Sequence, residues 1–372
     1  MATFTKPVGD LADFMQSGRS WQLIDKDYVH SEAVKRNYFL TTLMRGRSDD
    51  DLFRAPYGGT KFEWRIKFAT NGSYGPYNPY QEEDVAAVNT LKVLELPFSM
   101  NRSKYPMADE EEDLNSMDLK RFVNLKESRA QDDWIDQING MEAQLWATPV
   151  AATMETADTG GVARVPMSML AFITRDGLAP ATTGGDGVAV NWTTIQQLNP
   201  TTYDLYRNPT GTYTAATPTD PDAGIIPPMD TMHRKLKMER PPTQITKYAE
   251  DFALQKLAIV TNGTGQDQYV KALRAVNDRM ERVSDPSISL PQHFGIPVMW
   301  VEQLDALSWT YPDYIFINGN YIKPVFHSKW YFLTKEVEGG IRQPNVKATF
   351  HFTWWQLACA SRRLGGGRIY GA

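Results

Sequence analysis

The stretch KFEWRIKF at residues 61–68 alternates without exception between charged and apolar side chains. Successive side chains of a β-strand point to opposite faces, so this period of two predicts a strand with one charged face and one apolar face. The apolar face is formed by Phe62, Trp64, Ile66 and Phe68. We therefore expect this strand to lie with its apolar face against other protein atoms.

A second alternating run follows a segment rich in turn residues. Residues 71–80 read NGSYGPYNPY, and such clusters of glycine, proline and asparagine are typical of turns. Beyond them, Leu94, Leu96, Phe98 and Met100 recur at every second position. The two runs predict a long two-stranded hairpin whose tip is residues 71–80. Because a lone hairpin is marginally stable in water, its apolar stripe needs cover, either from its own chain or from a neighbouring subunit.

The residues upstream of the hairpin have the pattern of an arm. The opening is polar and holds Pro7 and Gly9, and a helical pattern runs from about His30 to Arg45. Residues 1–10 lack the apolar centre of a signal peptide. No stretch of the chain reaches the roughly 18 to 20 apolar residues of a membrane span. We therefore expect neither a targeting segment nor a membrane anchor.

A long helical pattern without proline runs from Asp109 to Trp146. Its acidic opening suits the positive end of a helix dipole, and we favour this interpretation over a metal site because consecutive carboxylates point around a helix. Apolar residues recur at steps of three and four, which predicts one apolar face. We expect the later part of that face to pack against a C-terminal strand. The residues concerned are Trp134, Ile138, Met141 and Leu145 on the helix, and Phe350, Phe352 and Trp354 on the strand.

The second half of the chain combines weakly patterned and strand-like segments. Residues 148–228 are rich in Thr, Gly, Pro and Ala, and they predict loops or short strands in a surface insertion. A short helix is expected from about Met229 to Glu239, between two proline pairs. A second helix is expected from about Gln266 to Val283. The strands expected in this half are residues 257–260, 294–301, 314–318, 347–354 and 355–359.

Composition limits the class of protein. The chain has 372 residues, of which 42% are hydrophobic, so a sizeable core can be buried. Aromatic residues make up 12%, which suits either an aromatic-rich core or large contacts between subunits. The formal net charge of -5 provides no overall basic footprint for tight nucleic-acid binding. The single cysteine, Cys359, excludes an intrachain disulfide and is expected to be a small buried side chain.

Motifs for catalysis or metal binding are missing from the sequence. The turn TNGTG at residues 261–265 lacks the residues that complete a phosphate loop, so we interpret it as a plain strand-to-helix turn. Arg362, Arg363 and Arg368 are interpreted as a small exposed basic tail. We predict no catalytic residue, no cofactor site and no metal site. The histidines are not at metal-ligand spacing; they are His30, His233, His293, His327 and His351.

The order of these parts resembles the Hong Kong ninety-seven fold, an α+β fold of the major capsid proteins of tailed bacteriophages. The downstream likeness is the more specific one. There, a strand, a TNGT turn and a helix lead to HFGIPV at residues 293–298, which is similar to the family's Phe-Gly-x-Pro-Val strand. YIFIN at residues 314–318 and CASRR at residues 359–363 are also similar to that family. The likeness rests on the order of these segments across nearly the whole chain, and residues 148–228 do not match the family clearly.

The resemblance implies a division of the chain into the family's parts. These are an N-terminal arm (1–45), an extended hairpin called the E-loop (46–108), a peripheral or P domain with a long spine helix and a surface insertion (109–243), an axial or A domain (244–320), and closing P-domain strands with a C-terminal tail (321–372). In this arrangement the hairpin reaches over a neighbouring subunit. The expected inter-subunit contacts are Asn71, Tyr74, Tyr77, Tyr80, Phe62 and Trp64.

The resemblance also implies a function. It predicts a structural protein, not an enzyme, that self-assembles as hexamers and pentamers into the icosahedral shell around the double-stranded DNA of a tailed phage. The expected partners are other copies of the chain, a scaffolding protein, a portal and a decoration protein, with weak nonspecific contact to packaged DNA and none to a membrane. The arm is too short for the family's scaffolding segment, so the scaffold is expected to be a separate protein. The expected location is the virion capsid, after folding and assembly in the bacterial cytoplasm.

Two other classes of protein stay open at this stage. The aromatic residues also suit a secreted carbohydrate-binding or carbohydrate-active protein, although a signal peptide and a convincing pair of catalytic carboxylates are missing. The third hypothesis is that the protein is another virion component, such as a portal or a tail protein. A portal should be richer in long helices than this chain is.

Overall fold

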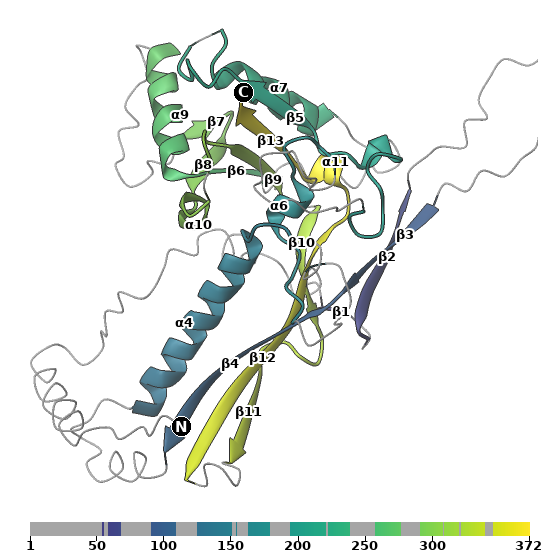
Figure 1. Cartoon of the computed structure of the whole chain (residues 1–372), viewed down its shortest axis with the longest axis vertical. Coiled ribbons are helices and arrows are strands. Elements are labelled where there is room, and N and C mark those ends of the chain that lie inside the picture. Colours follow the sequence, from purple (N-terminus) through teal and green to yellow (C-terminus); the bar gives the residue numbers. More distant parts are fainter. Residues whose placement is uncertain are drawn as a thin grey trace, which may run out of the picture. The chain divides into compact units, whose positions relative to one another are not determined.

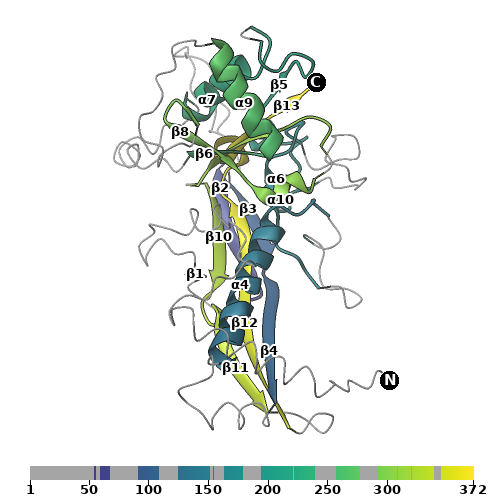
Figure 2. The same cartoon turned by 90° about the vertical axis from the view of Figure 1, so that its left-hand side faces the viewer.

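The protein contains helices and sheets arranged in two compact units, as seen in a computed structural model (Figures 1 and 2). The small unit takes its described residues from 101–141 and 332–353, and the large unit takes the rest. The expected arm at residues 1–45 and the hairpin tip at residues 71–80 lie outside the described residues. The structure describes residues 54–55, 59–67, 91–108, 125–150, 154, 163–178, 194–220, 222–238, 257–276, 291–307, 309–319, 321–338 and 345–372.

The small unit combines strand pairing with one long helix. Strand β11 (Leu333–Glu338) pairs antiparallel with the first part of β12 (Val346–Cys359), from Leu333 opposite Phe352 to Glu338 opposite Lys347. Strand β4 (Ser99–Ala108) also pairs with β12. Helix α4 (Leu125–Leu145) runs beside both strands (Figures 1 and 2). The long helix predicted between residues 109 and 146 is therefore present over its described part.

The buried side of α4 is partly polar. Asp133 and Gln137 lie one turn apart on that side, and both are buried. The Asp133 carboxylate accepts a hydrogen bond from the Ser103 hydroxyl at 3.0 Å and contacts the ring of His351. The Gln137 amide donates to the Thr353 hydroxyl at 2.5 Å. Polar pairs therefore join the helix to β4 and β12.

The predicted packing of α4 is confirmed for the strand but wrong for the face of that strand. The β12 residues that contact α4 are His351 and Thr353, and both are buried. Phe350 and Phe352 point to the opposite face, where their rings stack at 5.9 Å between centroids and remain half-buried. The helix still contributes an aromatic contact, because the Trp134 ring lies 4.8 Å from the His351 ring. The face of β12 that packs against α4 is therefore the face whose side chains form buried hydrogen bonds with the helix, and not the more hydrophobic face.

The large unit is built on a six-stranded mixed sheet covered by two helices. The helices are α7 (Ile226–Met238) and α9 (Gly263–Val276), which contact each other and the sheet (Figure 1). Strand β6 runs parallel to β8, while β13 runs parallel to β5 and antiparallel to β9. The strands lie in the order β5 (Thr210–Tyr213), β13 (Gly366–Gly371), β9 (Tyr314–Asn318), β6 (Leu257–Thr261), β8 (Ile296–Trp300) and β7 (Gln292–His293).

An apolar core fills the space between this sheet and the two helices. Each large apolar side chain buried there contributes about 1.5–3 kcal/mol relative to exposure. The predicted strands at residues 257–260, 294–301 and 314–318 supply part of the core, as their apolar runs indicated. The buried members are Tyr213, Ile225, Met229, Met232, Leu236, Ile259, Tyr269, Ile296, Val298, Tyr314, Phe316 and Ile369.

The C-terminal residues form part of this sheet, so the prediction of an exposed basic tail is wrong. Strand β13 lies between β5 and β9, and the short helix α11 (Arg362–Gly365) precedes it. Arg362 and Arg368 are buried, and Arg363 is half-buried. Glycine makes this close packing possible, because a Cβ at Gly366 would lie 2.4 Å from the Phe316 carbonyl oxygen. The hydropathy pattern of the sequence did not reveal that the C-terminal backbone packs this closely against a neighbouring strand.

The segment predicted as a surface insertion, residues 148–228, contributes to the core where the structure describes it. Every residue of the short helix α6 (Met169–Phe172) is buried. The 3-10 turn η2 (Asp204–Tyr206) ends on the buried Tyr206, and β5 belongs to the central sheet. The surface-insertion prediction is therefore wrong for these residues. Their Thr, Gly and Pro content reflects short elements and tight turns instead of exposure.

The hairpin is confirmed as two antiparallel strands of the large unit. Strand β2 (Lys61–Lys67) pairs with β3 (Leu91–Pro97), with Trp64 opposite Leu94. Leu94, Leu96 and Phe98 are buried as predicted, whereas Met100 is 52% exposed. The alternation shifts between β3 and β4, because Ser99 is also buried and donates to the Arg164 carbonyl oxygen at 2.6 Å.

The remaining strands and the last short helix complete the described elements. Strand β1 (Arg54–Ala55) pairs parallel with β10 (Ile322–His327), and β10 pairs antiparallel with the last part of β12. In this region the Trp354 ring stacks on the Trp330 ring at 4.7 Å. Helix α10 (Glu302–Asp305) follows β8.

Candidate functional site

The hairpin carries apolar side chains on both of its faces. On one face, Phe62 and Trp64 lie opposite Leu96 and Leu94 and remain half-buried, with their rings 5.2 Å apart. On the other face, Val93 of β3 is 50% exposed among charged neighbours of β2. The Lys61 ammonium group forms an ion pair with Glu95 at 3.0 Å on that face. Exposed apolar groups on a paired ribbon are suited to contact with another molecule.

Of the six residues expected to make inter-subunit contacts, the structure describes two. Phe62 and Trp64 lie side by side on the same face of β2. The other four, Asn71, Tyr74, Tyr77 and Tyr80, lie outside the described residues.

Arg362 is a fully buried cation held by neutral oxygen atoms. Its guanidinium group donates to the carbonyl oxygens of Phe172 at 2.7 Å and Leu178 at 2.9 Å, and to the Asn208 amide oxygen at 2.9 Å. The group also lies over the Tyr206 ring at 5.5 Å. Burial lowers the pKa of Arg362 because it disfavours the charged form. This residue joins α11 to the segments around α6 and η2, which makes it a structural centre.

A second buried arginine is paired with a carboxylate. Asp313 accepts hydrogen bonds from Arg368 at 2.6 Å and from Arg175 at 2.8 Å. The Arg368 guanidinium lies 5.2 Å from the centre of the Trp309 ring. Two cations on one buried carboxylate form a charge-assisted network that fixes β13 beside the loop before β9. Sequence reasoning missed this network because its three charged residues are far apart in the chain.

The histidines that the structure describes are all buried, and two of them gather near α7. His293 lies 3.3 Å from an Asp230 carboxylate oxygen, and its other ring nitrogen lies 3.3 Å from the Tyr269 hydroxyl. The His233 ring lies 6.2 Å from the His293 ring, edge to face. Burial lowers the pKa of His293, partly opposed by Asp230. Such a cluster is sensitive to protonation.

The other polar cluster has the residue types of a catalytic triad but not its order. Asp133 lies between Ser103 and His351, accepting from the serine hydroxyl and contacting the imidazole. A nucleophilic serine requires the histidine next to its hydroxyl so that the ring can take the proton. Here the aspartate occupies that position, so the cluster does not activate a nucleophile.

The strand-to-helix turn at residues 261–265 is a plain turn, as predicted. The Gly263 amide at the start of α9 donates to the Asp305 carboxylate at 2.7 Å, and the Gly265 amide donates to the Asn262 side chain at 2.8 Å. The Trp300 indole donates to the same Asp305 carboxylate at 2.5 Å. These amides are already bound to groups of the chain, so the turn does not offer them to a phosphate.

Other expectations can be checked over the part of the chain that the structure covers. Cys359 is buried, which raises the pKa of its thiol to about 12 and makes it inert, as expected for a core side chain. Within the described ranges, no group of three His, Cys, Asp or Glu side chains is placed to hold a metal ion. No helix among them is long and apolar enough to cross a membrane.

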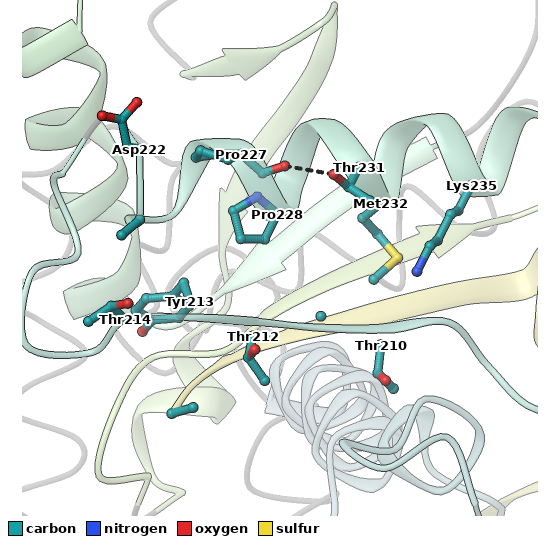
Figure 3. Close-up of a pocket in the computed structure, with 13 residues that line it drawn as sticks. Thr210, Thr212, Tyr213, Thr214, Asp222, Pro227, Pro228, Thr231, Met232 and Lys235 are labelled. Carbon is teal, nitrogen blue, oxygen red and sulfur yellow. Dashed lines mark hydrogen bonds between the residues drawn. The ribbon is translucent and has the colours of Figure 1, made fainter.

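A groove of about 430 Å³ lies between β5 and α7 in the large unit (Figure 3). Thr210, Thr212 and Thr214 line it from the strand side, and Met232 and Lys235 line it from the helix side. Its volume lies within the range of small-ligand or peptide-side-chain pockets. Sequence reasoning did not find this groove, because it placed residues 210–214 in a surface loop.

Comparisons with known proteins support the fold. No protein-family model matches the chain, and no curated protein matches its sequence. The cyanophage A-1(L) capsid asymmetric unit matches with a TM-score of 0.61 at 13% identity, covering 99% of both chains. The capsid of a native GTA particle matches with a TM-score of 0.47 at 10% identity, covering 93% of this chain and 95% of that one. The satellite phage P4 procapsid, a structure that includes the size determination (Sid) protein, matches with a TM-score of 0.42 at 11% identity, covering 96% of this chain and 97% of that one.

The match to the cyanophage capsid extends over nearly the full length of both chains. The chain therefore has the Hong Kong ninety-seven fold of phage capsid proteins, and the predicted α+β class is confirmed. At 13% sequence identity this likeness establishes the fold alone.

Proposed function

We propose that this protein is a major capsid protein that self-assembles into the icosahedral shell of a tailed phage. The observation that carries the proposal is the match over 99% of both chains to a cyanophage capsid asymmetric unit. The hairpin of β2 and β3 supports the proposal, because it has apolar groups at the surface of a single subunit on both of its faces. These are Phe62 and Trp64 on one face and Val93 on the other. A shell subunit covers such groups with its neighbours.

The parts of the chain would divide this task in the following way. The arm (1–45) and the E-loop (46–108) reach neighbouring subunits, with Asn71, Tyr74, Tyr77, Tyr80, Phe62 and Trp64 in the contacts. The P domain with its spine helix (109–243) and the closing strands (321–372) form the rigid body of the subunit, and the A domain (244–320) faces the centre of each hexamer or pentamer. The sheet of the large unit supports a modification of these limits, because β5 and β13 join the A-domain strands β6, β8 and β9 in one sheet.

The proposed partners follow from this role. Copies of the chain contact one another in hexamers and pentamers, and a separate scaffolding protein, a portal and a decoration protein complete the particle. The protein would fold and assemble in the bacterial cytoplasm and end in the virion capsid. The net charge of -5 suits weak contact with packaged DNA, because a shell that bound the DNA tightly would oppose its movement.

The proposed role is structural, without catalysis. The polar clusters described above have partners that fix the fold: Asp133 joins α4 to β12, and Arg362 joins α11 to the segments around α6. The carbohydrate-binding alternative has no such support, because the stacked tryptophans Trp330 and Trp354 pack on each other.

Electron microscopy of the expressed chain, alone and with the products of the genes beside it, tests the proposal. Closed shells of uniform size are expected. Rings typical of portal or tail proteins, or a monomer that binds glycans, would contradict it. Deleting residues 71–80 should leave a soluble chain with unchanged circular dichroism that no longer forms closed shells. Normal shells from that deletion would contradict the role of the E-loop tip.

A further inference from the structure

The turn between β7 and β8 holds an aromatic residue in a backbone conformation that favours asparagine or glycine. His293 pairs with Ile296, so only Phe294 and Gly295 form the turn, and their φ angles are +49° and +77°. Positive φ at both central residues is typical of a type I′ turn, in which asparagine and glycine are the preferred residues. A phenylalanine at the first of these positions carries backbone strain, because its Cβ lies too close to the following carbonyl oxygen.

The Phe294 side chain is also the most exposed large apolar side chain among the described residues, at 66%. Phe332, the other described phenylalanine with positive φ, is half-buried and packs against the ring of Trp134. Burial within the chain therefore does not account for an aromatic residue at position 294. Strained residues cluster at functional sites, and an exposed apolar ring suits contact with another molecule.

Two histidines hold this ring in position from its inner side. The ring centroid lies 4.9 Å from that of His233 on α7 and 4.8 Å from that of His293. His293 is fixed in turn, because its two ring nitrogens lie 3.3 Å from an Asp230 carboxylate oxygen and 3.3 Å from the Tyr269 hydroxyl. A ring that is already positioned loses little conformational freedom when a partner covers its outer side.

Helix α7 supports this ring on one side and forms a wall of the groove on its other side. Asp230 and His233 belong to the support, whereas Pro228 and Thr231 line the groove (Figure 3). At about 100° per residue, positions two apart lie on nearly opposite sides of a helix. The ring of Phe294 and the groove therefore lie on different flanks of the large unit. Contacts between two different surfaces of identical subunits can close into a ring of copies.

The groove has the size and the lining for one aromatic ring. Its volume of about 430 Å³ exceeds the roughly 150 Å³ of an apolar protein cavity that binds benzene. Pro228 and Met232 supply apolar contacts from α7, and a thioether sulfur packs favourably against an aromatic ring. Lys235 lines the same wall, and an ammonium group is attracted to the face of a ring.

We propose that the Phe294 ring of one copy binds in the groove between β5 and α7 of the next copy, and that repetition of this contact closes the ring of subunits in a hexamer or pentamer. The inference rests on the proposed function, which places copies of the chain side by side. Each copy gives one aromatic ring to a neighbour and receives one from the neighbour on its other flank. Burial of the ring in the assembly offsets the backbone strain that the single subunit carries.

A substitution at position 294 separates the subunit from the assembly. Phe294→Asn removes the ring and places a residue that the turn favours. The denaturant midpoint of the unassembled chain should stay the same or rise, while the yield of closed shells should fall by about tenfold or more. Phe294→Tyr keeps the ring and is the matched control, with shells expected at the wild-type yield. A lower midpoint for Phe294→Asn would show that the ring stabilises its own chain, and wild-type shell yield would show that assembly does not use it. Either result would overturn the proposal.

Photo-cross-linking locates the partner of the ring. The chain carries p-benzoylphenylalanine in place of Phe294, and copies with light and heavy nitrogen isotopes are assembled together and irradiated. Mass spectrometry should find peptides that join position 294 of one isotope to residues 210–214 or 227–235 of the other. The same photoreactive residue in place of Val337, which is 51% exposed in the small unit, is the control and should not label the groove. Cross-links only within one chain, only to other segments, or none at all would overturn the proposal.

Shell formation and cross-linking are scored separately. If the wild-type chain forms no shells, the proposed function fails, and this inference fails with it. If shells form but position 294 labels no groove of another copy, the inference alone fails.

Discussion

Each of the two compact units of this chain is stabilised internally by different physical means. In the large unit, side chains such as Val298 and Phe316 fill an apolar core between a sheet and two helices. In the small unit, α4 meets the strands through Asp133 and Gln137, which pair with His351 and Thr353. An apolar core tolerates many arrangements of similar volume, whereas a buried polar pair is satisfied in one register only.

This difference between the two units indicates which of them requires a precise position of its helix. Burial of apolar area stabilises the large unit, and it depends little on direction. The polar contacts of the small unit contribute less net free energy, but a shift of α4 along β12 would leave buried groups without hydrogen bonds. We infer that the small unit is built for a defined helix position, and the predictions that follow test this contrast.

The largest effect is expected for a charge placed on the buried side of α4. Met141 is 2% exposed and Ile138 is half-buried, so Met141→Asp should prevent folding while Ile138→Asp should leave some soluble protein. Soluble yield and circular dichroism of the two variants measure this. Equal solubility of both variants would show that the buried side of the helix has been assigned wrongly.

A cavity in the large core should have the next largest effect. Phe316→Ala removes a side chain that is 1% exposed, and it should lower the free energy of unfolding by about 3–5 kcal/mol. Phe350→Ala, at a half-buried position of the small unit, should cost clearly less. Denaturant midpoints of the two variants give the comparison. A greater loss for Phe350→Ala would reverse the contrast between the units.

A nearly isosteric substitution in the small unit tests whether hydrogen bonding or buried apolar area stabilises the contact between α4 and β12. Thr353→Val keeps the shape of the side chain but removes the acceptor of the Gln137 amide, so it should cost about 1–3 kcal/mol. If apolar area held this interface, valine would be neutral or stabilising. Adding Gln137→Leu to Thr353→Val should recover part of the loss, because no donor is then left unpaired. A stabilised single variant, measured by its denaturant midpoint, would refute the polar account.

The smallest effect is a pH dependence in the large unit. Burial lowers the pKa of folded His293 below 6.5, so the unfolded chain binds a proton more readily. Stability should therefore be lost as pH falls through 6.5 toward the folded pKa, and should not change for this reason above 6.5. His293→Gln should flatten the dependence of the denaturant midpoint between about pH 8 and pH 5. An unchanged slope in that variant would assign the effect to another group.

Several elements could be predicted from sequence because their patterns are local. The alternation of KFEWRIKF and of Leu94, Leu96 and Phe98 identified the hairpin, and YIFIN identified β9 at its observed limits. The helix at α7 was marked by its prolines, although it begins at Ile226 and includes Pro227 and Pro228 in its first turn. The expected inter-subunit residues of the hairpin tip stay a prediction.

Other features were decided only by tertiary structure. Arg362 and Arg368 read as a polar tail, yet they are buried, because Phe172, Asn208 and Asp313 come from distant segments to accept their hydrogen bonds. A one-dimensional pattern records how polar a residue is, and it does not record which partners the fold brings to it.

For the same reason, the sequence pattern predicted neither which face of β12 packs against α4 nor the groove between β5 and α7. Phe350 and Phe352 are the more apolar residues, but His351 and Thr353 face α4, because Asp133 and Gln137 supply their partners there. The sequence by itself determined the hairpin and most strands, since period-two and helical patterns follow from backbone geometry, and the class of fold was implied by the resemblance of their order to a known family. Tertiary structure alone decided which polar groups are buried and which edge of the sheet ends beside α7, since both depend on pairings between residues far apart in the chain.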